Sequence, residues 1–172
     1  MGYPRSVNAT RIVVMGVAGS GKSTVGEALA GRLGARFVDG DSLHPAANVA
    51  KMAAGTPLDD DDRWPWLARV RAELRTGAPV VIACSALKRR YRDLLRHAEG
   101  VCFVYLDLTL DAAHARAAAR EGHFMSAAMV ESQFAALERP AAEETDVLAL
   151  DASAALEAVV ASAAAGATTA SN

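Results

Sequence analysis

Residues 16–23 read G-V-A-G-S-G-K-S, and the fold of the chain can be worked out from this point. The stretch matches the pattern G-x-x-x-x-G-K-[ST], and it directly follows a short apolar run at residues 11–15. After it, Val25, Leu29 and Leu33 recur every four residues on one face of a predicted helix. A strand, a glycine-rich loop and a helix in this order predict a loop that binds phosphate groups.

The chemistry of this loop follows from its backbone. Glycines at positions 16, 19 and 21 permit a tight turn whose N–H groups point inward, toward phosphate oxygens. Lys22 is expected to bridge the β- and γ-phosphates of a nucleotide, and Ser23 is expected to bind Mg²⁺. The alternative is a glycine-rich turn without a ligand, which would make the lysine, the serine and the helix coincidental. The predicted nucleotide-binding residues of the loop are Gly16, Val17, Ala18, Gly19, Ser20, Gly21, Lys22, Ser23 and Thr24.

The rest of the chain repeats the alternation of strand and helix. Four further apolar runs, each short enough for a strand, lie at residues 35–38, 79–84, 101–106 and 146–150. Because these runs are apolar on both faces and helical patterns lie between them, they predict a parallel sheet covered on both sides. We therefore expect a three-layer α/β fold with a five-stranded parallel sheet, in which residues 1–172 form one domain.

Two segments interrupt this alternation. Residues 39–76 insert two helical stretches between the second and third strands, and residues 116–142 lie between the fourth and fifth. Ligands of an open parallel sheet bind beyond the carboxyl ends of its strands, so these segments are predicted to be a substrate-binding cap and a lid. Residues 1–10 and the end of the chain from about residue 164 are expected to be flexible, because they offer little to bury.

Composition narrows the class of partner. The formal net charge of −2 and the absence of a basic tract argue against nucleic acid or an anionic membrane, so a small molecule is the expected ligand. No apolar stretch is long enough to span a membrane, and residues 1–10 lack the apolar centre of a signal peptide, which favours the cytoplasm. Cys84 and Cys102 lie within predicted strands and are expected to be reduced core thiols.

Carboxylates follow the second predicted strand. Asp39 and Asp41 are two residues apart, so both side chains can project from one side of an extended segment. Phosphorylation of a hydroxyl needs one carboxylate near the metal ion and one near the acceptor. The open alternative is an Asx-type turn that caps the next helix. The acidic run at residues 59–62 is interpreted as a solvated loop at a helix N-terminus rather than a metal site.

Polar and basic residues are predicted near the same edge of the sheet. Ser85 and Lys88 follow the third strand at its carboxyl end, beside the expected γ-phosphate position, and Lys88 suits a phosphate or acceptor contact. Arg92 is expected on the surface of the next helix, or beside Lys88 on the same face. Arg116 and Arg120 are four residues apart and are expected on one face near the end of a helix, which suits a lid.

Longer motifs resemble one family. The chain resembles the bacterial gluconate kinases in D-G-D-S-L-H-P-A-A-N-V-A-K-M-A-A-G-T-P-L-D-D-D-D-R-W-P-W-L at residues 39–67, C-S-A-L-K-R-R-Y-R-D-L-L-R at residues 84–96 and G-H-F-M at residues 122–125. Together with the phosphate loop these motifs occur in the family's order. The resemblance implies a fold similar to that of nucleoside-monophosphate and shikimate kinases, with ATP and Mg²⁺ as cosubstrates. It also implies transfer of a phosphoryl group to the 6-hydroxyl of D-gluconate.

The resemblance implies residue roles as well. Asp41 would be the acceptor-side base, and Asp39 would hold metal-bound water. Arg120 would close on the transferring phosphoryl group, and Arg116 would contact the adenine or the phosphates. The family's members are often dimers, so a homodimer is expected. The residues implied to bind gluconate are Asp41, His44, Lys51, Arg63, Ser85, Lys88 and His123.

Two other hypotheses stay open on the residues alone. One keeps the fold and changes the acceptor to shikimate or another small hydroxylated acid. The other is a nucleotide-binding switch that binds ATP and transfers phosphate to no small molecule. The pair Asp39 and Asp41, together with the lid arginines, favours transfer, because a pure switch would not need them.

Overall fold

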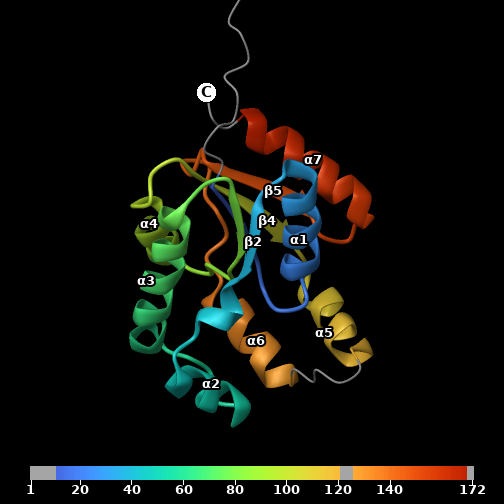
Figure 1. The fold of residues 1–172 in the computed structure, drawn as a ribbon. Coiled ribbons are helices and arrows are strands. Elements are labelled where there is room, and N and C mark those ends of the chain that lie inside the picture. Colours follow the sequence, from blue (N-terminus) through green and yellow to red (C-terminus); the bar gives the residue numbers. More distant parts are fainter. Residues whose placement is uncertain (1–10, 121–125, 170–172) are drawn as a thin grey trace, which may run out of the picture.

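The computed structural model of the chain describes residues 11–120 and 126–169 (Figure 1). Its centre is a five-stranded sheet in the order β2-β3-β1-β4-β5, and every neighbouring pair is parallel. The predicted five-stranded parallel sheet is therefore confirmed. The strands are β1 Arg11–Met15, β2 Arg36–Asp39, β3 Val80–Ala83, β4 Val101–Asp107 and β5 Val147–Asp151.

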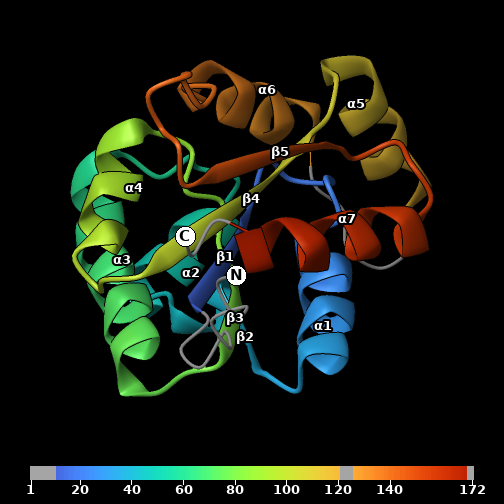
Figure 2. The ribbon, with the colours of Figure 1, turned by 90° about the horizontal axis from the view of Figure 1, so that it is seen from above.

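Helices cover both faces of the sheet. Helices α1 and α7 pack on one face and α3 and α4 on the other, which gives the three predicted layers (Figure 2). Helices α2, α5 and α6 lie instead beyond the carboxyl ends of the strands (Figure 1). The helices are α1 Lys22–Leu33, α2 Ala46–Ala53, α3 Asp60–Thr76, α4 Arg89–Arg96, α5 Leu110–Ala119, α6 Ala127–Ala136 and α7 Leu156–Thr169, with a 3₁₀ turn, η1, at Gly40–Leu43.

Strand β1 shows why the sheet lies in the middle. Its side chains alternate between the two faces, with Ile12 and Val14 in the core beneath α1 and α7, and Val13 and Met15 in the core beneath α3 and α4. All four are fully buried. A strand that is apolar on both faces can be accommodated only between two layers of helices.

The end of the chain differs from our expectation. Helix α7 continues to Thr169, so the prediction of a flexible end from about residue 164 was wrong for that part of the chain. Ala163, Ala164 and Ala167 are buried, and a Cβ atom at Gly166 would lie 2.2 Å from Leu148 Cδ2. Small side chains therefore let α7 approach β5 closely, and the resulting contact orders a segment whose composition alone suggested disorder.

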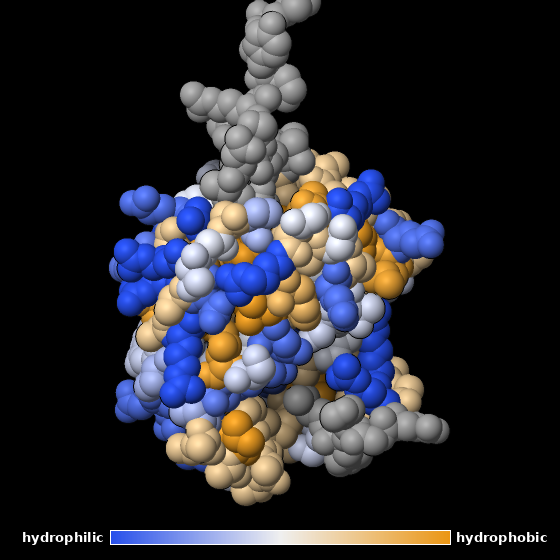
Figure 3. Space-filling view, in the orientation of Figure 1, coloured by the Kyte–Doolittle hydropathy of each residue, from blue (hydrophilic) through white to orange (hydrophobic). Residues whose placement is uncertain are grey.

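The two cysteines are free, as predicted. Burial raises the pKa of the Cys84 thiol to about 12 and that of Cys102 to about 11, so neither forms a reactive thiolate near neutral pH. Within the described residues, no helix has both the length and the apolar character needed to cross a membrane. Figure 3 shows hydrophilic residues scattered over one face, with apolar ones over α2, where Val49 is half exposed.

Arg92 is not on the surface, which corrects the prediction. Its side chain is fully buried and makes a two-pronged ion pair with Glu144, with N–O distances of 2.7 and 2.9 Å. Its Nη1 also donates to the carbonyl oxygen of Ala86 at 3.0 Å. Arg92 therefore joins α4 to the segment before β5 and holds the loop that carries Ser85. Its guanidinium pairs with Glu144 and does not share a site with the side chain of Lys88 as the alternative suggested, since Lys88 pairs with Asp60.

The Arg92–Glu144 pair predicts a pH-dependent stability. The arginine holds the pKa of Glu144 at about 2, below the ordinary 4.5. A folded-state pKa below the unfolded one stabilises the fold above pH 4.5, and this contribution is lost as the pH falls toward 2. We expect Glu144→Gln to lower the free energy of unfolding at pH 7, because Arg92 loses its counter-charge, and to flatten its dependence on pH between 5 and about 3.

Urea denaturation at a series of pH values measures this effect. Glu143→Gln is the matched control, because Glu143 is the exposed neighbour. The interpretation is wrong if the Glu144 and Glu143 variants show the same stability profile.

Candidate active site

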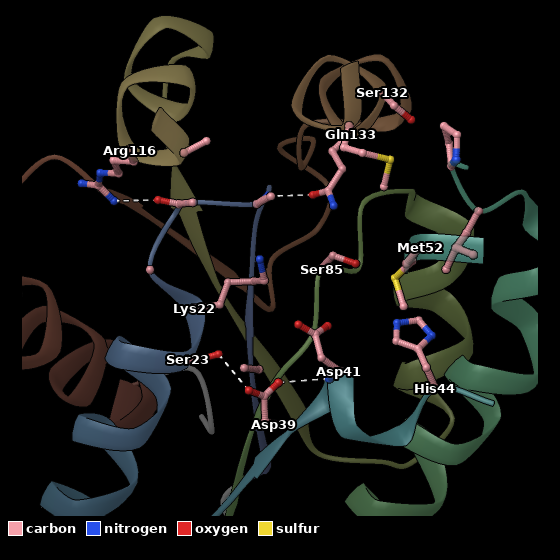
Figure 4. Close-up of a pocket in the computed structure, with 18 of the residues that line it drawn as sticks. Lys22, Ser23, Asp39, Asp41, His44, Met52, Ser85, Arg116, Ser132 and Gln133 are labelled. Carbon is pink, nitrogen blue, oxygen red and sulfur yellow. Dashed lines mark hydrogen bonds between the residues drawn. The ribbon is translucent and has the colours of Figure 1, made fainter. Parts of the chain in front are cut away.

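A cavity of about 860 Å³ opens beyond the carboxyl ends of the strands (Figure 4). Its walls come from segments that are far apart in the sequence. The phosphate loop and the start of α1 form one wall, the segment from Asp39 to Trp66 forms another, and α5 and α6 close the third. Residues from the segments 39–76 and 116–142 therefore meet at this edge of the sheet.

The phosphate loop has the predicted strand-loop-helix context. Gly16 and Gly21 adopt φ angles of 149° and 92°, which side chains rarely tolerate, and Gly16 N–H donates to the Ser85 carbonyl at 3.3 Å. No side chain of the described residues caps the N-terminus of α1. The amide groups of its first turn are therefore directed at the cavity without a capping partner, as a phosphate-binding loop requires.

Lys22 is placed within this loop. Its side chain is partly buried, and the ammonium group donates to the Val17 carbonyl at 3.0 Å. Burial lowers the pKa of Lys22, and the negative charge of Asp41 opposes part of that shift. A partly desolvated cation with only a carbonyl partner gains from an anion, which the phosphates of a nucleotide would supply.

Asp39 and Asp41 both line the cavity, but the segment between them is not extended. Asp39 ends β2 and accepts a hydrogen bond from Asp41 N–H at 3.0 Å, so the alternative of an Asx-type turn that caps η1 was right. The other oxygen of Asp39 accepts from the Ser23 hydroxyl at 3.1 Å. A Cβ atom at Gly40 would lie 2.3 Å from the Ala83 carbonyl, so only glycine allows this turn to pack against β3.

His44 is held in one orientation. Its ring stacks on Trp66 with centroids 4.2 Å apart, and Asn48 Nδ2 lies 3.1 Å from its Nδ1. Because the amide nitrogen of Asn48 donates, Nδ1 accepts and the proton resides on Nε2. Burial lowers the pKa of His44, which favours the neutral ring. Trp66 and Asn48 were missed as site residues, since a tryptophan in a helix usually packs in the core and a single asparagine gives no functional signal.

Arg63 reaches the cavity from α3. It is only 8% exposed, and its Nη1 lies 3.2 Å from the Tyr91 hydroxyl. That hydroxyl donates in turn to Asp60. Arg63 therefore presents a buried guanidinium whose orientation is supported by a neighbouring element, which suits recognition of a carboxylate.

Two predicted substrate residues lie elsewhere. Lys51 pairs with Asp62 at 2.8 Å and Lys88 with Asp60 at 3.0 Å, and neither lines the cavity. The acidic run begins α3, as predicted, with Asp59 and Asp62 forming a capping box. It is less solvated than we expected, because its carboxylates also hold these lysines. Ser85 does line the cavity, whereas His123 lies outside the described residues.

The lid region departs from the prediction in one detail. Helix α5 ends at Ala119, so Arg120 is not on a helical face with Arg116, although both side chains line the cavity. The extended backbone at Arg120 is what ends the helix there. Arg116 donates to the carbonyl oxygens of Gly19 at 3.0 Å and Ala152 at 2.6 Å, which anchors α5 to the phosphate loop.

Helix α6 supplies a residue that the sequence did not reveal. Gln133 accepts a hydrogen bond from Ala18 N–H at 2.7 Å, 115 positions away, and Met129 and Ser132 line the cavity beside it. A glutamine in a helical pattern carries no signal of its own, and only the folded chain brings it to the loop.

Similarity to known proteins agrees with this geometry. A family model described as an AAA domain matches residues 12–143. The chain is 50% identical over 155 residues to the thermoresistant gluconokinase of Escherichia coli (strain K12), a match that covers 87% of this chain and 89% of that protein.

Solved structures give the same result. The gluconokinase from Sinorhizobium meliloti 1021 is 45% identical, with a TM-score of 0.88, covering 94% of this chain and 93% of that one. A shikimate kinase from Aquifex aeolicus vf5 is 18% identical, with a TM-score of 0.61 over 91% and 94% of the two chains, which shows a shared fold alone. The chain, with its phosphate loop, acidic turn and buried Arg63 around one cavity, belongs to the gluconokinase family.

Proposed function

We propose that this chain is a gluconokinase, which transfers the terminal phosphoryl group of ATP to the 6-hydroxyl of D-gluconate and releases 6-phospho-D-gluconate and ADP. One observation carries the proposal. The cavity joins a phosphate-binding wall, with Lys22, to a wall with Asp41 and Arg63 that suits a hydroxylated acid. Family membership then identifies the acid as gluconate.

On the nucleotide side, the loop amides and Lys22 would bind the phosphates, with Arg116 alongside. The hydroxyl of Ser23 and the carboxylate of Asp39 are oxygen ligands of the kind that Mg²⁺ prefers. A bound Mg²⁺ ion would neutralise phosphate charge during transfer.

On the acceptor side, Asp41 would orient the 6-hydroxyl and accept its proton, which makes the oxygen a better nucleophile. Arg63 would bind the carboxylate of gluconate, and the Nε2 proton of His44 would bind a hydroxyl. We also retain Ser85, Lys88, Lys51 and His123 as predicted substrate residues. Lys51 and Lys88 would first have to leave their aspartates.

Arg120 would stabilise the charge of the transferring phosphoryl group. Because an open site would hydrolyse ATP, we propose that the region of residues 116–142 closes over the bound substrates and excludes water. We also propose a cytoplasmic location, as the sequence led us to expect, and a homodimer, as the family resemblance implies.

The product tests the proposal. With Mg²⁺, ATP and D-gluconate, we expect phosphorus and carbon NMR to show a single phosphomonoester at carbon 6. A phosphoryl group on another carbon would refute the assigned geometry of the acceptor, and inorganic phosphate alone would refute transfer.

Replacement of Arg63 tests the acceptor wall. Arg63→Met is expected to raise the KM for gluconate by about 10- to 100-fold, the range for one lost charge-assisted hydrogen-bond pair, while the KM for ATP changes little. Arg75→Met is the control, because Arg75 is exposed near the other end of α3. Initial rates with each substrate varied in turn measure both constants. Equal rises in both KM values would place Arg63 outside the gluconate pocket.

A further inference from the structure

Gln133 joins α6 to the phosphate loop by one hydrogen bond. Ala18 N–H donates to its Oε1 at 2.7 Å, and both residues line the cavity (Figure 4). This bond fixes the orientation of the side-chain amide. A backbone N–H can only donate, so the amide oxygen must face Ala18 and the nitrogen must face away.

The amide nitrogen of Gln133 is therefore available to a ligand. Figure 4 shows it directed into the cavity, above Lys22 and Ser85. Within the described part of the chain, this nitrogen has no hydrogen-bond acceptor. The two N–H groups of this nitrogen face the cavity, so a ligand oxygen at this position could accept from them.

The surroundings indicate an anionic ligand. Lys22 Nζ contacts the carbonyl of Val17, and Gln133 Oε1 contacts the N–H of Ala18. These two groups belong to the single peptide unit that links Val17 to Ala18, so the lysine and the glutamine hold opposite edges of the same peptide. Arg120 lines the same cavity. Lys22, Gln133 and Arg120 thus supply donors to the cavity beside the loop on which a phosphate chain would bind.

We propose that Gln133 binds the terminal phosphoryl group of the nucleotide through its amide nitrogen, while its amide oxygen holds Ala18. Helix α6 would then contact a triphosphate differently from a diphosphate, and Gln133 would help the site to discriminate ATP from ADP. The proposal rests on the nucleotide half of the proposed function and is independent of the acceptor.

Two substitutions separate this role from a purely structural one. Gln133→Glu keeps an oxygen that can accept from Ala18 but replaces the amide donors by a second oxygen. Gln133→Met keeps the length of the side chain and removes both functions. If Gln133 only tethers α6 to the loop, Gln133→Met weakens the binding of both nucleotides alike. The negative charge that Gln133→Glu adds also repels phosphate, so Gln133→Met is the decisive variant.

The measurement is calorimetric binding of ADP and of the non-hydrolysable analogue adenylyl imidodiphosphate, each with Mg²⁺ and without gluconate. The quantity compared is the ratio of the Kd for the triphosphate analogue to the Kd for ADP. We expect this ratio to rise at least about tenfold in both Gln133 variants. Glu131→Gln is the control, an exposed position on the same helix that we expect to leave the ratio unchanged.

Three outcomes would overturn the proposal. These are an unchanged ratio in both variants, a loss in Gln133→Met alone, and an equal loss for the two nucleotides. If the protein binds both nucleotides but does not phosphorylate gluconate, the acceptor assignment is refuted. The comparison of the Gln133 variants then still tests the role of Gln133.

Discussion

Asp41→Asn is expected to lower kcat with gluconate by at least about 100-fold while ATP binding stays close to that of the unchanged protein. The carboxylate lines the acceptor side of the cavity, and its backbone N–H, which the substitution keeps, is held by Asp39 at 3.0 Å. Asparagine preserves the shape and can still accept a hydrogen bond, but it cannot take the proton of the hydroxyl. We therefore expect phosphoryl transfer to be lost and ATP binding to be kept.

Steady-state rates and nucleotide titration measure the two halves of this prediction. Asp61→Asn is the matched control, since Asp61 is an exposed carboxylate of the acidic run that begins α3. One secondary effect is expected, because the charge of Asp41 raises the pKa of Lys22, and its loss would lower that pKa further. A turnover within a few-fold of the unchanged enzyme would remove Asp41 as the base.

Lys22→Met is expected to reduce kcat/KM for ATP by at least about 100-fold. The ammonium group is the cation of the phosphate loop, and its contact with Val17 shows that it reaches the loop backbone where the phosphates would bind. Methionine has a similar length but no charge. Since burial already lowers the pKa of Lys22, its removal is not expected to destabilise the protein without ligand.

Paired measurements of kcat/KM and of unfolding by urea test this combination of lost activity and retained stability. Arg32→Met serves as the control, a cation at the exposed end of the same helix α1. Full activity in the Lys22 variant would contradict the assignment of the loop, and unfolding would show that the lysine is needed for the fold itself.

The fold could be predicted where the signal is local. The phosphate loop lies within eight consecutive residues, and each strand is a short apolar run whose two faces need cover, so spacing alone was sufficient. The end of α7 could not be predicted, because its order depends on the fit of Gly166 against Leu148. Arg92 likewise looked like a surface residue until its partner Glu144, 52 positions away, was placed beside it.

The candidate site also has residues that the sequence reveals and residues that it does not. Asp39, Asp41 and Arg63 are charged, lie in a segment that the family motif marks, and all line the cavity. The turn at Gly40 was misjudged as extended, because the close approach of β3 that determines it involves residues far along the chain. Gln133 had no signal, since its role depends on a contact that exists only in the folded chain.

The most direct test of the account is release of ADP by the unchanged protein with Mg²⁺ and ATP against a panel of acceptors. The panel would hold D-gluconate, shikimate, other aldonates, glucose and nucleoside monophosphates, with a sample that contains no acceptor. We predict release that depends on an acceptor and is selective for gluconate. Selectivity for shikimate or another acceptor would contradict the assignment of gluconate, and equal release without any acceptor would contradict phosphoryl transfer and indicate a nucleotide switch.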